Sequence, residues 1–293
     1  MIRPAVLAAI TAVLTLAPLA GVNGEPAALT SCTAPAALAT IGPALAHAAA
    51  KVEAGQKLTI VAIGSSSTSG TGASAPSLAY PARLEAELRE RFPNLDLTVI
   101  NRGKGGEDAA QELARFDRDV LAEHPDLVIW QLGTNAVLRR DDVAGDGELI
   151  RRGIEQLTSA GADVVLMDLQ YAPRVLARPG HVIMERLIAD AAKSERVGLF
   201  QRFELMRNWQ DRPPADAAAM IGPDGLHMTD RGYGCLATEL AGALAANWRV
   251  QRDPARSAGR RPAGHRTSSL RSDMSYRAQD ASRNARAATW ASR

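Results

Sequence analysis

The sequence predicts a three-layer α/β/α sandwich built on a central parallel sheet of about five strands. Short runs rich in Val, Ile and Leu recur along the chain, and between them lie longer stretches whose apolar residues stand three and four apart. The short runs lack a clean apolar–polar alternation, which suits strands covered by helices on both faces. This succession of the two patterns is typical of repeated β-α units.

Five strands are expected, at residues 58–63, 97–100, 127–132, 164–168 and 197–200. Five helices are expected with them, at residues 80–91, 108–121, 148–160, 182–195 and 230–248. Pro81 fits the first turn of a helix, whereas Pro93 and Pro125 mark helix ends before the next strands. Because an open α/β sheet binds its ligands beyond the carboxyl ends of its strands, functional residues are expected in the segments that follow them.

The 293 residues divide into four parts. Residues 1–24 have the pattern of a secretory signal, because Arg3 precedes an apolar run that is short for a membrane span. Residues 25–56 form an Ala- and Pro-rich leader, residues 57–249 the main domain, and residues 250–293 a tail too poor in large apolar side chains to fold alone. We therefore expect an exported protein, periplasmic or secreted; a retained membrane anchor is the alternative reading of the N-terminus.

The net charge of +2 is unevenly distributed. Residues 250–293 carry ten Arg and three Asp, a net +7, so the rest of the chain carries −5. This distribution argues against a basic core that binds nucleic acid, and we expect no nucleic-acid partner. We expect a monomer without stable membrane insertion after removal of the signal, and a solvated tail, with a surface or lipid contact by its arginines as the alternative.

The chain has two cysteines, Cys32 and Cys235. In an oxidising compartment they permit one disulfide that closes a loop of about 200 residues, which would stabilise the fold by restricting the unfolded chain. Two separate buried thiols are the alternative.

Two motifs carry residues suited to nucleophilic catalysis. The first strand runs into Gly64-Ser65-Ser66-Ser67-Thr68-Ser69-Gly70, a small-residue turn that can expose a hydroxyl, although such turns are also ordinary helix caps. Near the other end, Asp224-Gly225-Leu226-His227 places a carboxylate and an imidazole in one turn. The carboxylate can then fix the histidine tautomer so that the second ring nitrogen accepts a serine proton.

Two further segments offer hydrogen-bond donors for an oxyanion. After the second strand, residues 101–107 include Gly106 in a glycine-rich turn, and after the third strand comes Gly133-Thr134-Asn135. Donors of this kind must be fixed before the reaction to stabilise developing charge. Taken singly, Gly106 and Asn135 are each more typical of ordinary turns.

These blocks, in this order, resemble those of the SGNH/GDSL hydrolase family, over roughly residues 57–248. The resemblance implies a flavodoxin-like fold and a serine esterase that cleaves acyl or acetyl esters through an acyl-enzyme. It implies Ser66 as the nucleophile, with Asp224 and His227 completing the triad. It further implies an oxyanion hole formed by Ser66, Gly106 and Asn135.

Ser65 departs from the family pattern, since the chain has Gly-Ser-Ser-Ser where Gly-Asp-Ser-Leu is usual. The register of the block makes Ser66 the nucleophile. Gln170 and Tyr171 follow the fourth strand and are candidate substrate contacts, with loop packing as the alternative. The expected substrate is a small ester, an acylated glycan or a lipid.

Other chemistries find less support. The pattern Gly70-x-Gly72-x-x-Ala75 starts too far from the strand end to bind a dinucleotide, and no histidine or cysteine pattern indicates a metal. We therefore expect no cofactor and no metal. The remaining alternatives are an O-acyltransferase of the same family acting on a glycan, and a catalytically silent relative that binds carbohydrate or lipid.

Overall fold

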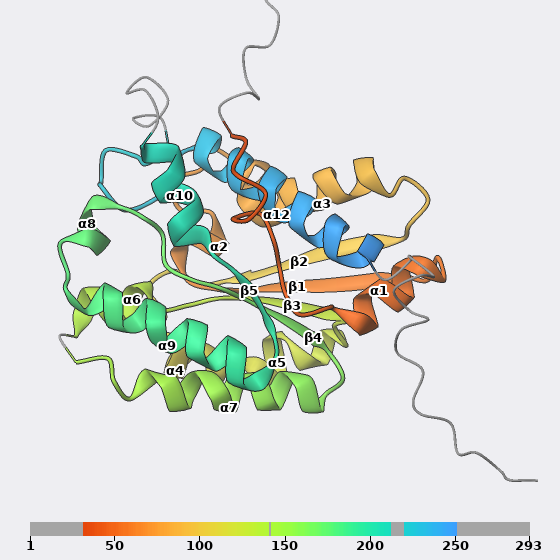
Figure 1. Ribbon diagram of the computed structural model, residues 1–293, viewed down its shortest axis with the longest axis horizontal. Helices are drawn as coiled ribbons and strands as arrows, with labels where there is room; N and C mark the ends of the chain where they lie inside the picture. Colours follow the sequence, from red (N-terminus) through yellow and green to blue (C-terminus); the bar gives the residue numbers. More distant parts are fainter. Residues whose placement is uncertain (1–31, 141, 212–219, 251–293) are drawn as a thin grey trace, which may run out of the picture.

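The computed structural model describes residues 32–140, 142–211 and 220–250, and its core is one parallel sheet with the strand order β2-β1-β3-β4-β5. The predicted signal segment and nearly all of the predicted tail lie outside these residues. The strands are β1 (Leu58–Gly64), β2 (Leu97–Gly103), β3 (Leu127–Gln131), β4 (Asp163–Met167) and β5 (Gly198–Phe200). Each coincides with a predicted strand, and helices cover both faces, so the predicted three-layer fold is confirmed (Figure 1).

The helices form one layer on each side of the sheet (Figure 1). The first layer contains α1 (Ala46–Glu53), α3 (Tyr80–Arg91), α10 (Arg202–Gln210) and α12 (Asp230–Val250). The second contains α4 (Ala109–Leu113), α5 (Phe116–Asp119), α6 (Thr134–Arg139), α7 (Asp146–Ser159) and α9 (Gly180–Glu195). Short helices follow β1 and β4, namely α2 (Ser66–Ser69) and α8 (Pro173–Leu176), and two 3₁₀ turns span Pro76–Leu78 and Leu121–Glu123.

Successive side chains of the central strands pack alternately against the two helix layers. On β1, Ile60 packs with the first layer and Val61 with the second, and on β3 Ile129 and Trp130 divide in the same way. Because both faces are covered by apolar residues, the strand sequences are nearly continuous apolar runs, as parallel strands require.

The region predicted as one helix over residues 108–121 is broken, and this prediction was wrong. Asp108 caps α4 through a capping box with Gln111, but the helix stops after Leu113 and α5 begins at Phe116. Between them Arg115 leaves the helical backbone, and its side chain is buried in contact with Glu107. The break thus coincides with a buried charged residue. Strand β2 also differs from its prediction, since it continues three residues past the predicted end, to Gly103.

Residues 32–56 contribute to the same core as the rest of the domain. Ile41, Leu45 and Val52 are buried in the first layer, and Asn247 of α12 donates to the Ile41 carbonyl at 2.7 Å and accepts from the Leu45 N–H at 2.9 Å. We therefore assign this segment to the same folded unit as residues 57–249.

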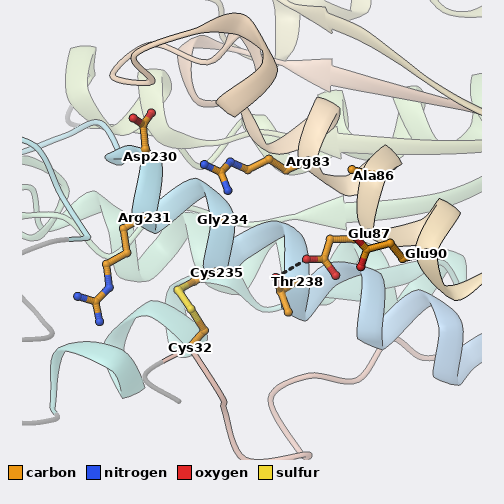
Figure 2. A pocket seen from close by; sticks show the side chains of 10 residues that line it. All are labelled: Cys32, Arg83, Ala86, Glu87, Glu90, Asp230, Arg231, Gly234, Cys235 and Thr238. Carbon is orange, nitrogen blue, oxygen red and sulfur yellow. Dashed lines mark hydrogen bonds between the residues drawn. A yellow bond between two sulfur atoms is a disulfide. The ribbon is translucent and has the colours of Figure 1, made fainter. Parts of the chain in front are cut away.

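A disulfide joins Cys32 to Cys235 on α12. Figure 2 shows it beside a hollow of about 370 Å³, whose rim carries charged side chains of α3 and α12. None of the predicted catalytic residues lines this hollow. Within the described part of the chain, no helix has both the length and the apolar character needed to cross a bilayer.

The seating of α7 on the sheet depends on the absence of a side chain at Gly153. A Cβ there would lie 2.4 Å from two ring carbons of the buried Trp130, whereas a Cβ at Gly242 of α12 would meet nothing within 4 Å. We predict that Gly153→Ala lowers the free energy of unfolding by about 1–3 kcal/mol through overpacking. Gly242→Ala is the matched control and should raise it by roughly 0.5–1 kcal/mol, because alanine restricts the unfolded chain.

Urea unfolding of the two variants beside the wild type measures both changes. Equal free energies of unfolding for the two variants would contradict the packing argument.

Candidate active site

The serine turn, residues 64–70, connects β1 directly to α2. Ser65 and Ser67 are buried, whereas Ser66 is half-buried at the first position of α2, and its Oγ lies 2.9 Å from Nε2 of His227. Close approach of β2 fixes the turn from below, since a Cβ at Gly103 would lie 2.1 Å from the backbone nitrogen of Ser69. Among the three consecutive serines, the structure brings Ser66 to the imidazole.

The second half of the site is the turn before α12. The residues on either side of it, Ile221 and Met228, form an antiparallel bridge, and Thr229 Oγ1 accepts from the Gly232 N–H at the start of α12. Between them, Asp224 Oδ2 lies 2.5 Å from His227 Nδ1. The strand-like bridge and the capped helix thus hold the carboxylate and the imidazole in a fixed relation.

The Asp224 carboxylate remains charged throughout the physiological range. Partial burial by itself would raise its pKa, but the hydrogen bond with the His227 ring and those from the backbone N–H groups of Leu226 and His227 outweigh this effect and lower the pKa to about 2. A charged partner at Nδ1 favours the tautomer that carries its proton there, which leaves Nε2 as the acceptor that faces Ser66.

The predicted oxyanion residues lie on two neighbouring loops. Gly106 has φ +84°, a conformation that glycine adopts readily, and a Cβ on the preceding Gly105 would lie 3.9 Å from the Ser66 Cβ. Asn135 lies in the first turn of α6, and its Nδ2 donates to the carbonyl of Glu107 at 2.8 Å. The structure therefore links Asn135 to the loop of Gly106, and that loop to Ser66.

Polar residues beneath the site were not predicted. Gln131, the last residue of β3, is buried, and its Oε1 accepts from Ser65 N at 3.2 Å, Ser65 Oγ at 3.3 Å and Thr68 Oγ1 at 3.2 Å. Arg115 is buried against Glu107. The sequence offered one signal for Gln131, which is a polar residue inside an otherwise apolar strand. It offered no signal for Arg115, because the pattern around that residue is typical of a helix.

Gln170 does not face the catalytic residues. It is 1% exposed, and its Oε1 accepts from Thr134 Oγ1 at 2.8 Å and from Arg202 Nη2 at 2.9 Å. Burial raises the pKa of nearby Asp168 to about 7 and lowers that of Arg202 to about 10. Gln170 therefore belongs to a buried polar layer, and the expectation that it contacts substrate was wrong.

Tyr171 is half-buried and lies beside the turn that contains Asp224 and His227. Its ring packs edge-on against Phe203, and it lines a hollow of about 370 Å³ together with Pro173, Leu176 and Gly225. Tyr171 therefore remains a candidate contact for a substrate that extends beyond the predicted triad.

Among the described residues, no group of three or more His, Cys, Asp or Glu side chains is arranged to hold a metal ion.

The sequence model of the Non-GDSL lipase-like family matches residues 31–249, almost all of the described chain. The chain belongs to this family. The match confirms the resemblance to SGNH/GDSL hydrolases. A curated relative, an acetylxylan esterase of Geobacillus stearothermophilus, is 31% identical over 99 residues, which is 32% of this chain and 45% of the relative. The chain thus matches less than half the length of that relative.

Several solved structures share the fold. A two-domain esterase active on acetylated mannans superposes with a TM-score of 0.56 at 23% identity, over 68% of this chain and 52% of the esterase. The structure of TesA gives 0.55 at 23% identity, over 64% of this chain and 99% of TesA. The Geobacillus stearothermophilus acetylxylan esterase Axe2 gives 0.54 at 20% identity, over 65% and 95%.

The low pKa of Asp224 yields a direct test of the acid–base pair. We predict that His227→Ala raises the pKa of Asp224 from about 2 toward its ordinary value near ~3.9, without reaching it, because the backbone N–H groups still donate to the carboxylate. Carboxyl ¹³C NMR titration measures the pKa. Asp230, whose pKa is lowered by hydrogen bonds from Ser74, is the internal control and should not move. An unchanged Asp224 pKa would refute the contact.

Proposed function

We propose that this chain is an exported serine esterase that hydrolyses carboxylic esters through an acyl-enzyme on Ser66. One observation carries the proposal: the unbroken hydrogen-bonded series from Asp224 Oδ2 to His227 Nδ1 at 2.5 Å and from His227 Nε2 to Ser66 Oγ at 2.9 Å. A serine hydroxyl is a weak nucleophile alone, and an oriented imidazole in contact with it supplies the base that it needs.

In the first half of the reaction, Ser66 Oγ attacks the carbonyl carbon of the ester while His227 Nε2 takes the hydroxyl proton. The bond to the alcohol oxygen then breaks, and the proton passes from Nε2 to the departing alcohol. In the second half, water attacks the acyl-Ser66 carbonyl and gives its proton to Nε2. The carboxylic acid leaves, and Ser66 regains its proton.

The negative charge of the tetrahedral intermediate is assigned to three donors. Ser66 is the first residue of α2, so its N–H has no acceptor within the helix. The N–H of Gly106 and the side-chain amide of Asn135 complete the group, and one Asn135 N–H is held by the Glu107 carbonyl. Donors that are fixed before the reaction stabilise charge without reorganisation.

The names of the relatives suggest the first substrates to test. Both the curated relative and two of the structural neighbours are described as esterases of acetylated xylan or mannan. Acetate release from acetylated xylan and mannan, compared with hydrolysis of p-nitrophenyl acetate and of longer p-nitrophenyl esters, separates a glycan deacetylase from an esterase of longer acyl chains.

Export is proposed on the sequence of residues 1–24, and the disulfide between Cys32 and Cys235 supports it, since such bonds persist in oxidising compartments. Sequencing the N-terminus of the protein recovered from outside the cytoplasm tests this part.

The nucleophile is tested by covalent labelling. We predict that Ser66 Oγ attacks the phosphorus of a fluorophosphonate probe and displaces fluoride, so that mass spectrometry finds the phosphonyl group on Ser66. Ser66→Ala should abolish labelling, whereas Ser67→Ala should retain it, because the Ser67 side chain is buried and it is the Ser66 hydroxyl that lies 2.9 Å from His227 Nε2. An adduct on Ser65, or labelling that survives Ser66→Ala, would contradict the assignment.

The oxyanion donors are tested by substitution. We predict that Asn135→Ala lowers kcat about 10²–10³-fold with KM nearly unchanged, because the donor acts mainly on the tetrahedral intermediate. Arg140→Ala is the control: Arg140 follows α6 and binds the buried carboxylate of Asp146 rather than a residue of the site, so its kcat should stay at the wild-type value. A wild-type kcat in Asn135→Ala would remove Asn135 from the site.

A further inference from the structure

Arg115 contacts two segments next to the proposed site, the end of β1 and the loop that contains Gly106 and Glu107. Its side chain is 6% exposed, and each guanidinium nitrogen donates to a different group. Nε donates to Glu107 Oε2 at 2.6 Å, Nη1 to Asp119 Oδ2 at 3.2 Å and Nη2 to the carbonyl of Gly64 at 3.3 Å. Gly64 is the last residue of β1, Glu107 lies in the loop after β2, and Arg115 lies in the break between α4 and α5.

Two of these partners, Gly64 and Glu107, lie within two residues of a residue of the proposed reaction. Gly64 ends β1 two residues before Ser66, and its carbonyl also accepts the Lys104 N–H at 2.9 Å. Glu107 follows Gly106 directly, and its carbonyl accepts from Asn135. The guanidinium therefore joins the strand end that carries the nucleophile to the loop that carries the oxyanion donors.

We propose that Arg115 is a positioning residue that sets the distance between Ser66 and the oxyanion donors by binding Gly64 and Glu107 with one rigid guanidinium plane. The role rests on the proposed esterase function. Arg115 does not touch the substrate; it acts through the backbone on either side of it.

The contacts favour positioning over a direct electrostatic effect. Arg115 is neutralised locally by two carboxylates, Glu107 and Asp119, so little of its charge is left to act on an oxyanion. A lysine cannot reproduce the geometry of the Arg115 contacts. Its ammonium group sits on a flexible chain and lacks the planar set of donors that binds two partners at a fixed separation. A misplacement of about 1 Å at a reacting centre can cost about 10²-fold in rate.

The experiment measures kcat, KM and the affinity for a boronic acid that forms a tetrahedral adduct with the serine. We expect Arg115→Lys to lower kcat about 10–100-fold, to change KM less than about twofold, and to weaken boronate binding by the same factor as kcat. Arg140→Lys is the matched control, since Arg140 also binds a buried carboxylate, that of Asp146, but contacts neither loop. It should retain the wild-type values.

A double variant separates positioning from stability. Arg115→Met alone leaves Glu107 buried without its main partner and is expected to destabilise the fold, whereas Arg115→Met with Glu107→Gln removes both charges. The proposal expects the pair to recover most of the lost unfolding temperature while kcat stays at least tenfold below wild type. Recovery of kcat together with stability would overturn it, as would a wild-type kcat in Arg115→Lys.

The two proposals fail in different ways. If the wild type hydrolyses p-nitrophenyl acetate no faster than Ser66→Ala, the esterase mechanism is wrong and the role of Arg115 falls with it. If the wild type is active through Ser66 and Arg115→Lys is equally active, only the role of Arg115 is refuted.

Discussion

Strand β1 is hydrogen-bonded to β2 on one side and to β3 on the other, with Gly64 opposite Gly103 and Ile63 opposite Trp130. Because the three strands are parallel and in this register, they end at the same edge of the sheet and release their following segments side by side. The serine turn, the Gly106 loop and the Asn135 helix are those segments. The remaining contribution, the Asp224–His227 turn, reaches the same edge from the far end of the chain by packing α12 against α3.

Two kinds of polar environment meet at that edge. Above it, Asp224 is 45% exposed and keeps a low pKa through hydrogen bonds, which suits a group that must remain charged beside an imidazole. Below it, burial dominates: the pKa of Glu112 rises to about 8 although Trp130 donates to it, and that of Asp168 rises to about 7. The proposed acid of the triad is therefore partly in contact with solvent, whereas the polar side chains beneath the site are buried.

The sequence predicted those features that depend on local pattern. Apolar runs located all five strands, and the spacing over residues 80–91 gave α3 with its observed ends. Ser66 and His227 could be proposed because each lies in a short motif whose chemistry is readable in isolation. Arg115 could not, since the partners that tie it to the site, Glu107 and Gly64, lie 8 and 51 residues away along the chain and its own surroundings look like an amphipathic helix. Gln170 was misjudged for a related reason: position after a strand does not reveal whether a side chain faces solvent or the layer below.

The serine at position 65 illustrates how the buried layer constrains the site above it. The Gly-Asp-Ser-Leu pattern that this segment resembles has an aspartate at this position, but here Gln131 Oε1 faces both the Ser65 N–H and the Ser65 hydroxyl from below. A carboxylate at position 65 would place its oxygens against Gln131 Oε1, so that two acceptors would face each other. Turning the Gln131 amide would relieve that conflict but would place its NH₂ group against the Ser65 N–H, so that two donors would face each other. A hydroxyl avoids the conflict, because it donates to Oε1 while the backbone N–H does the same. The Ser-Ser-Ser turn and the glutamine beneath it are therefore mutually compatible, and the contact between Ser66 Oγ and His227 Nε2 forms without an aspartate at position 65.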